Sequence, residues 1–273
     1  MPFSVRDKNM ITAKNYTQLF IQASLSQFTF LVKSMLSHEI THFHQESLNP
    51  LEPFEPQLEA IFNAHELLQN KYDAVLVLHD NTLNTLVPQA LFDENALGAY
   101  LQYSTKVFAT DFFAFDELDS YEMNNVYVPY MNINNFLIDK FGGFTYQNIN
   151  TPLISKILDL NKNQAQTTVY AYLQKDHFEL IVAQNTKLIL FNSFAYQSVE
   201  DFMYYILFTY EQLGLTPEIH PLILLGAVED NDPIHQTTLR FIRNVSFIKS
   251  RVFISNLLKI REEADQHYIL FNL

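Results

Sequence analysis

The chain has 273 residues, of which 48% are hydrophobic and 17% charged, and its formal net charge is −13. Low charge together with 14% aromatic residues excludes an intrinsically disordered chain, and the length suits one large domain or two smaller ones. Only five glycines are present, and none of their spacings forms a G-x-G-x-x-G or Walker-type loop, so a glycine-rich nucleotide loop is excluded as well.

The first predicted unit consists of three strands, a helix and a fourth strand. Apolar runs at 19–23 and 28–32, separated by a short polar turn, predict a hairpin, and a third strand is expected at 38–45. Apolar side chains recur at helical spacing over 55–70. The continuous apolar run at 73–79 is typical of a buried parallel strand.

Two segments in the middle of the chain are similar to each other, and each is expected to begin a helix. The segments 87–103 and 128–143 each begin with Val-Pro and continue into a helical pattern. Between them, 106–120 predicts a strand followed by an acidic turn. Thr151-Pro152 is expected to open a short helix, and the polar stretch 161–168 is the expected linker.

The order of the first unit recurs in the second half of the chain. Three predicted strands at 169–173, 178–183 and 187–194 are followed by a helix and then by a strand at 221–226. Residue identity between the two halves is low, so the repeat is one of pattern. Chance agreement between two common α/β patterns is the alternative explanation.

Further helix signals lie in the second half. Ser198, with Asp201 three residues later, forms a capping box for the expected helix, and Asp232-Pro233 begins another. The apolar tail 267–273 predicts a late strand, which would complete a sheet in its own chain or add to a partner's sheet.

Several segments carry a resemblance to a known fold superfamily. They are TLVPQALF (85–92), DFFAFD (111–116), VYVPYMNINNF (126–136), EDFMYYILFTYEQL (200–213) and RNVSF (243–247). Together with the repeated order of strands and helix, they make the chain resemble the superfamily of actin, sugar kinases and DnaK-like chaperones. More closely, it is similar to an uncharacterised bacterial family of degenerate actin-like proteins of unknown function.

The resemblance implies an α/β fold with two ribonuclease-H-like lobes in an actin-like ATPase arrangement, in which helices flank mixed sheets. The first lobe, with inserted strands and helices, is expected at 1–150 and the second lobe at 151–273.

The resemblance also implies where an ATP site would lie. The superfamily places an acidic residue and a glycine in the first hairpin turn of each lobe, and a glycine pair after a late strand. Here the first turn is Ser24–Gln27, without either residue type; the second is Gln174–His177, with Asp176 but no glycine; and the late strand ends in the single Gly226. We therefore expect a degenerate ATP site with Asp176 and Gly226 as its remnants, no catalytic residues, no cofactor and no bound nucleotide.

One segment matches a zinc-protease motif. His38, Glu39 and His42 form H-E-x-x-H, which on a helix would place both histidines on one Zn²⁺ with the glutamate as general base. Possible third ligands are His44, Glu59, His65 and Glu66. On the strand expected here, His38 and His42 would lie about 13 Å apart, too far for one ion. We therefore expect no metal site, and a zinc hydrolase remains an alternative.

Two charged segments are candidate surfaces. A basic stretch without acidic residues forms a possible partner patch of Arg240, Arg243, Lys249, Arg251, Lys259 and Arg261. It would suit an acidic partner, an RNA backbone or the acidic half of the chain, although a helix end followed by a solvated loop explains the same charges. An acidic group comprises Asp111, Asp116, Glu117, Asp119 and Glu122. It is expected to be a solvated loop rather than a metal-binding nuclease site.

These patterns together predict a non-catalytic, cytoplasmic protein-interaction or scaffold module. Cysteine is absent, no secretory signal is visible, and no apolar run reaches 18 residues. The partner is an unknown protein or a second copy of the chain; we expect neither a membrane nor nucleic acid, since phosphate contact needs a basic surface. The alternatives are a nucleotide-binding switch with weak ATP affinity and the zinc hydrolase at His38–His42.

Overall fold

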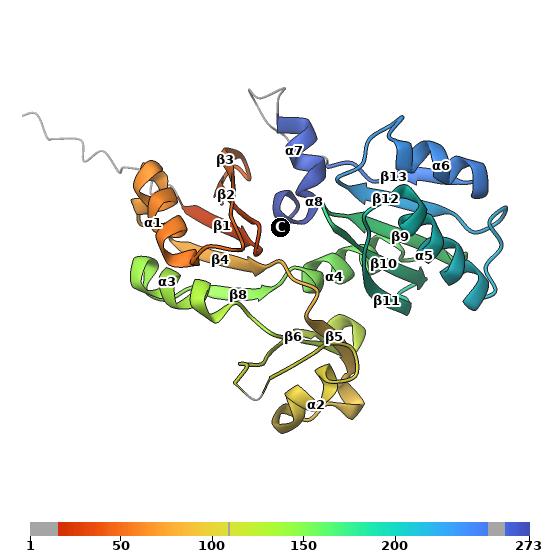
Figure 1. The fold of residues 1–273 in the computed structure, drawn as a ribbon, viewed down its shortest axis with the longest axis horizontal. Coiled ribbons are helices and arrows are strands. Elements are labelled where there is room, and N and C mark those ends of the chain that lie inside the picture. The colour runs from red at the N-terminus through yellow and green to blue at the C-terminus, as the bar shows by residue number, and fades with distance from the viewer. Residues whose placement is uncertain (1–15, 109, 251–259) are drawn as a thin grey trace, which may run out of the picture.

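Two five-stranded sheets with the same strand order organise the fold (Figure 1). The structure is a computed structural model that describes residues 16–108, 110–250 and 260–273, and in the last range it describes side chains from residue 263 onward.

The first sheet has the order β3-β2-β1-β4-β8. Its strands are β1 (Thr17–Ala23), β2 (Gln27–Ser34), β3 (Ile40–Ser47), β4 (Ala74–His79) and β8 (Thr145–Asn148). β1, β2 and β3 pair antiparallel, whereas β4 runs parallel to β1 and β8 parallel to β4. The predicted hairpin, third strand and buried strand are all confirmed.

The second sheet repeats this arrangement in the order β11-β10-β9-β12-β13. Its strands are β9 (Thr168–Leu173), β10 (His177–Gln184), β11 (Lys187–Ala195), β12 (Leu222–Gly226) and β13 (Val245–Phe247). The pairing follows the first sheet strand by strand, with β9 and β10 antiparallel and β12 parallel to β9. The repeated pattern of the sequence is therefore a repeat of structure.

Helices cover the outer face of each sheet. α1 (Phe54–Ala64) and α3 (Met131–Phe141) pack on the first sheet through Leu58, Phe62 and Leu137. α5 (Val199–Gln212) and α6 (Pro233–Phe241) pack on the second sheet. The predicted capping box begins α5, because the Ser198 hydroxyl accepts from the Asp201 amide and the Asp201 carboxylate accepts in return. We call the first sheet with α1 and α3 the first lobe, and the second sheet with α5 and α6 the second lobe.

A small third sheet lies below the first lobe in the view of Figure 1. Its order is β5-β7-β6, formed by β5 (Asn84–Pro88), β6 (Ala114–Leu118) and β7 (Met123–Tyr127). α2 (Leu97–Leu101) packs on it. Short 3₁₀ helices lie at Glu66–Gln69, Gln89–Leu91, Glu94–Ala96 and Asp119–Tyr121. The first Val-Pro segment is therefore broken into short helical pieces, whereas the second forms the continuous helix α3.

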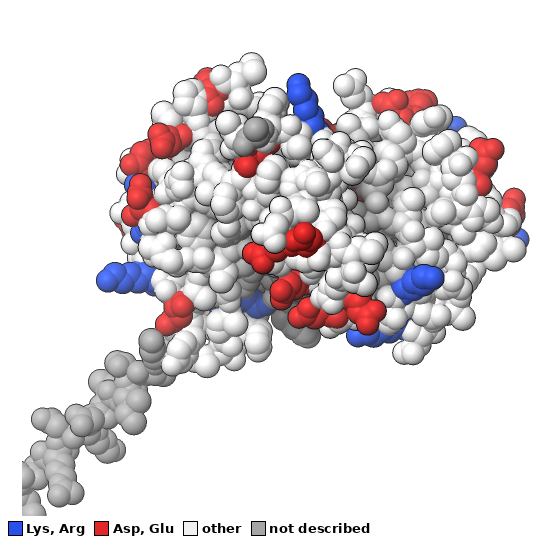
Figure 2. Space-filling model, turned by 90° about the horizontal axis from the view of Figure 1, so that it is seen from below, with Lys and Arg blue, Asp and Glu red and all other residues white. Residues whose placement is uncertain are grey.

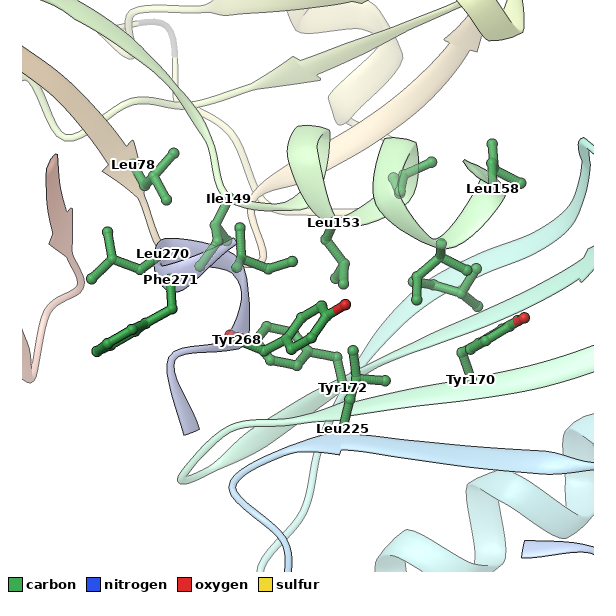
Figure 3. Packing of buried hydrophobic residues seen from close by; sticks show 14 of the residues in the cluster. Leu78, Ile149, Leu153, Leu158, Tyr170, Tyr172, Leu225, Tyr268, Leu270 and Phe271 are labelled. Carbon is green, nitrogen blue, oxygen red and sulfur yellow. The ribbon is translucent and has the colours of Figure 1, made fainter. Parts of the chain in front are cut away.

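The inner faces of the two lobes share one apolar core, which Figure 3 shows. α4 (Asn150–Leu160) and α8 (Tyr268–Phe271) lie between the sheets and bury their apolar side chains there. The first lobe contributes Phe20 and Leu31, and the second contributes Tyr170, Tyr172 and Leu225. Two of the chain's own helices thus form the core between the sheets.

The prediction of a strand at 267–273 is wrong. After α7 (Ile260–Gln266), the last residues form α8, in which Tyr268, Ile269, Leu270 and Phe271 are all buried. A short apolar run does not distinguish a strand from a fully buried helical turn, and here contact with both lobes decides the outcome.

The acidic segment is likewise not a solvated loop throughout. Asp116 lies on β6, and its carboxylate accepts hydrogen bonds from the Thr151 hydroxyl at 2.6 Å and the Asn148 amide at 2.9 Å. Burial raises the pKa of Asp116 to about 6, an effect that these hydrogen bonds partly offset. Asp116 therefore ties the third sheet to the start of α4, while Glu117 and Asp119 remain exposed.

Acidic side chains outnumber basic ones on the face of the molecule that is shown in Figure 2. On the face shown in Figure 2, Asp and Glu side chains gather near the middle, and Lys and Arg are few. Within the described ranges, no helix has both the length and the apolar character that crossing a membrane requires.

Candidate functional site

The first hairpin turns of the two lobes line one pocket. This pocket has a volume of about 280 Å³ and is bounded by the β1–β2 turn 24–27, the β9–β10 turn 174–177 and the segment 80–83 that follows β4. Tyr130 lines it as well. These two turns are the segments at which the sequence resemblance placed the expected phosphate contacts, so their chemistry decides what the site can do.

The first turn offers no charged group to the pocket. Its backbone closes through the Ser24 amide and the Gln27 carbonyl at 2.9 Å, and the Ser24 hydroxyl accepts from the Ser26 amide. The Gln27 side-chain amide lies 3.2 Å from the Thr29 hydroxyl and 3.3 Å from the His267 ring. The turn is therefore held by its own side chains and by the residue that precedes α8, and no carboxylate is present to hold Mg²⁺.

The second turn carries a partly buried charged group, His177, that no sequence motif marks. His177 lies 2.7 Å from Asp176 through Nδ1 and 3.2 Å from Glu179 through Nε2. The Glu179 side chain is 1% exposed. Asp80 follows β4 of the first lobe and lines the same pocket; it is buried and accepts a hydrogen bond from the Gln22 side-chain amide at 2.8 Å. We call Asp80, Asp176, His177 and Glu179 the interlobe charge cluster.

Electrostatic coupling within this cluster keeps His177 protonated. Burial lowers the pKa of His177, but the negative charges of Glu179, Asp80 and Asp176 outweigh that effect and raise the pKa to about 10. Burial raises the pKa of Asp80 to about 6, against the opposing effect of the His177 charge. One imidazolium is therefore coupled electrostatically to three carboxylates, whose combined charge disfavours a free polyphosphate in this pocket.

The late-strand position has a separate pocket of about 450 Å³. It is lined by Gly226, the loop 227–230, Asp232, Lys249 and the end of α7. Gly226 has a φ of 91°, and a Cβ placed on it would lie 2.2 Å from the Leu173 carbonyl oxygen. The glycine is thus required by the close approach of β12 to β9, a packing reason that holds without any ligand.

Replacing Gly226 by alanine is expected to destabilise the fold by more than about 2 kcal/mol, because positive φ and a backbone clash add to one another. Gly214 is the matched control: it follows the C-terminal end of α5 with a φ of 64°, but nothing lies within 4 Å of its Cβ position. Gly214→Ala should cost only the conformational part, about 1–2 kcal/mol. Urea unfolding of both variants measures the difference, and equal losses would contradict a steric role for Gly226.

The zinc-protease motif does not form its helix. His38 is exposed in a turn with a φ of 56°, and His42 is exposed on β3, the edge strand of the first sheet. Glu39 precedes the strand and is half-buried. The other residues considered as ligands separate: Glu59 pairs with Lys140 at 2.6 Å and Glu66 is exposed, whereas His44 and His65 come together.

The basic stretch is only partly described. Arg240 is exposed in the last turn of α6, and Arg243 is exposed beyond that helix. Lys249 is exposed and pairs with Asp230 at 3.3 Å. Arg251 and Lys259 lie outside the described residues, and Arg261 belongs to α7 with its side chain outside them. Asp176, the other predicted remnant, lies in the second turn beside His177.

The interlobe charge cluster was missed because Asp80 is distant in the sequence from Asp176, His177 and Glu179. Asp80 directly follows a buried strand, and His177 and Glu179 are two residues apart on one strand face, which is the available signal. A polar run at strand ends is too common to predict that these groups meet across two lobes.

Solved structures with this arrangement of lobes confirm the fold. A Bacteroides thetaiotaomicron protein, described as having an actin-like ATPase fold and unknown function, matches with a TM-score of 0.81 at 18% identity, covering 95% of this chain and 96% of that one. A chain of the PilM–PilN type IV pilus biogenesis complex matches with a TM-score of 0.58 at 9% identity, covering 93% of this chain and 96% of that one. At such identities the likeness shows the fold alone.

Comparison with curated proteins gives no match. The model of one family, described as a protein of unknown function (DUF3822), matches residues 6–245. That match spans both lobes, and the chain belongs to the DUF3822 family.

Proposed function

We propose that this protein is a non-catalytic member of the actin-like fold, in which the ATP site is degenerate and protein surfaces carry the function. The observation that carries the proposal is α8. Its four residues are buried between the lobes, and its side chains join the core that contains Phe20 of the first lobe and Tyr172 of the second. A helix in this position ties the two lobes together through the core that they share.

The chemistry of the two turns supports the same proposal. Phosphoryl transfer needs a cation held against the phosphates and a positioned water, and both depend on carboxylates and on backbone that can approach the ligand. The first turn has neither glycine nor carboxylate. His177 engages the carboxylate of Asp176 in the second turn and that of Glu179 on β10.

An aromatic surface on the second lobe is the proposed contact region. Tyr204 and Phe208 on α5 are 62% and 45% exposed, and their rings stack at 5.9 Å. Leu239 and Phe241 are exposed on the neighbouring helix α6. Exposed apolar groups of this size are typical of interaction surfaces. One structure with this fold, PilM–PilN, is itself a protein complex.

A thermal-shift titration with Mg²⁺-ATP and Mg²⁺-ADP tests the loss of nucleotide binding. A ligand at a hundred times its Kd stabilises the native state by about 2.7 kcal/mol, which for a chain of this size corresponds to roughly 5 °C or more in Tm. We expect a shift below about 1 °C at millimolar nucleotide. A saturable shift of several degrees would favour the nucleotide-binding switch, for which the pocket beside Gly226 is the available space.

The interaction surface has its own test. A partner recovered by affinity purification should be lost with the double variant Tyr204→Ser/Phe208→Ser. Lys187→Ser, which changes an exposed residue at the start of β11, is the matched control and should retain it. Equal recovery by all three proteins would contradict the assignment of this surface.

A further inference from the structure

A histidine and carboxylate cluster lies on the first lobe, away from the interlobe pocket. His44 Nε2 lies 2.8 Å from Glu46 Oε1, and His65 Nε2 lies 3.6 Å from the same oxygen. The two imidazole rings are 3.9 Å apart between centroids. One donor atom from each residue can be chosen so that all three lie within 4.8 Å of one another.

The fold brings these residues together for definite reasons. His44 and Glu46 are two positions apart on β3, so their side chains leave the same face of the sheet. His65 ends α1, the helix that covers this face, and its backbone amide caps the helix through the Ile61 carbonyl. The cluster therefore bridges the edge strand and the C-terminal end of the helix.

Phe30 forms an apolar floor under both rings. It is 1% exposed, it pairs with His44 across β2 and β3, and its ring lies 5.5 Å from His44 and 5.4 Å from His65. The side chains of His65, His44 and Glu46 are 22%, 36% and 43% exposed. The two imidazole rings thus pack on Phe30, while all three donor side chains remain partly exposed to solvent.

We propose that His44, Glu46 and His65 form a binding site for a divalent transition-metal ion, Zn²⁺ in the first instance. Three donors about 2.1 Å from one tetrahedral ion lie about 3.4 Å apart, and the two distances above fall on either side of that value. Two imidazoles and a carboxylate suit zinc better than Mg²⁺ or Ca²⁺, which prefer oxygen ligands. The fourth position faces solvent and takes water.

This site differs from the zinc-hydrolase hypothesis in residues and in consequence. It uses neither His38 nor His42, and it supplies no helix-borne general base. Because the ligands come from β3 and α1, the ion would join an edge strand to the helix above it and stabilise the first lobe. It is independent of the proposed interaction function.

Titration of the tag-free, EDTA-treated full chain with Zn²⁺ tests the site. We expect one equivalent of Zn²⁺ to bind with an increase in Tm, and Co²⁺ to give the visible absorption of a tetrahedral site. His65→Phe removes the ligand nitrogen but keeps a ring over Phe30, and Glu46→Gln removes the carboxylate. Each should weaken binding by more than the roughly 10- to 100-fold cost of losing an outer-shell partner.

His42→Ala is the matched control, because His42 is an exposed histidine on the same strand that is not part of the cluster. It should bind Zn²⁺ as the unchanged protein does. Circular dichroism in EDTA verifies that each variant is folded. Unsaturable binding in the unchanged protein, or equal affinity in His65→Phe and the unchanged protein, would overturn the proposal.

Discussion

Replacing Leu270 by alanine is expected to lower the free energy of unfolding by about 2–5 kcal/mol, the range for truncating a fully buried leucine. Leu270 is 1% exposed and lies on α8 within the core shared by both lobes. Leu239→Ala is the matched control, since Leu239 is also helical but 49% exposed, and its loss should stay within about 1 kcal/mol. Urea unfolding followed by circular dichroism measures both.

The role of α8 also predicts how many unfolding transitions a truncated chain shows. If α8 is what joins the lobes, removing residues 267–273 should separate one cooperative unfolding transition into two, because each lobe keeps its own sheet and outer core. The clusters that contain Leu58 and Phe202 do not include α8. A deletion variant that still unfolds in a single transition at nearly unchanged urea concentration would contradict the role given to α8.

Local patterns predicted the repeated part of the fold. The strand runs at 19–23 and 169–173 have the period and length of buried strands, and Ser198 with Asp201 marks where α5 begins. These signals lie within a few residues of the structure they specify. The same order of strands and helix occurs in both halves of the chain, and this repeat indicated two related lobes. The resemblance supplied the arrangement of the lobes.

Contacts between distant segments decided what the sequence did not show. The tail run YILF is apolar at every position, so it fits a strand and a buried helical turn equally well, and only burial between the lobes selects the helix. Asp116 is acidic in an acidic stretch, yet Thr151 and the Asn148 amide make it part of an internal network. His44 and His65 were predicted only as possible third ligands of a zinc ion bound by a helix over His38–His42, and that helix does not form.

Replacing His177 by glutamine is expected to destabilise the protein by about 3–5 kcal/mol at pH 7, because it leaves buried carboxylates without their cation. His177 is 18% exposed, and its partner Glu179 is 1% exposed. His42→Gln, which changes an exposed histidine on β3, is the control and should be nearly neutral. A loss below about 1 kcal/mol for His177→Gln would show that water or rearrangement screens the cluster.

The pH dependence of this loss identifies its cause. The folded pKa of His177, about 10, lies above its ordinary value of 6.5, so the folded state binds more protons than the unfolded state between these values. The stability that His177 contributes is therefore complete below pH 6.5 and is lost as the pH rises toward 10. The unchanged protein should lose stability over this window, and His177→Gln should lose much less.

Lowering the pH should reduce the difference in unfolding free energy between His177→Gln and the unchanged protein. The folded pKa of Asp80 is already raised to about 6 by burial, and removal of the neighbouring positive charge raises it further. Protonation then removes the uncompensated charge, so lowering the pH from 7 toward 5 should stabilise His177→Gln relative to the unchanged protein. Unfolding free energies at pH 5, 7 and 9 should thus differ most between the two proteins at pH 7. A difference that is constant across these pH values would assign the loss to packing rather than to charge.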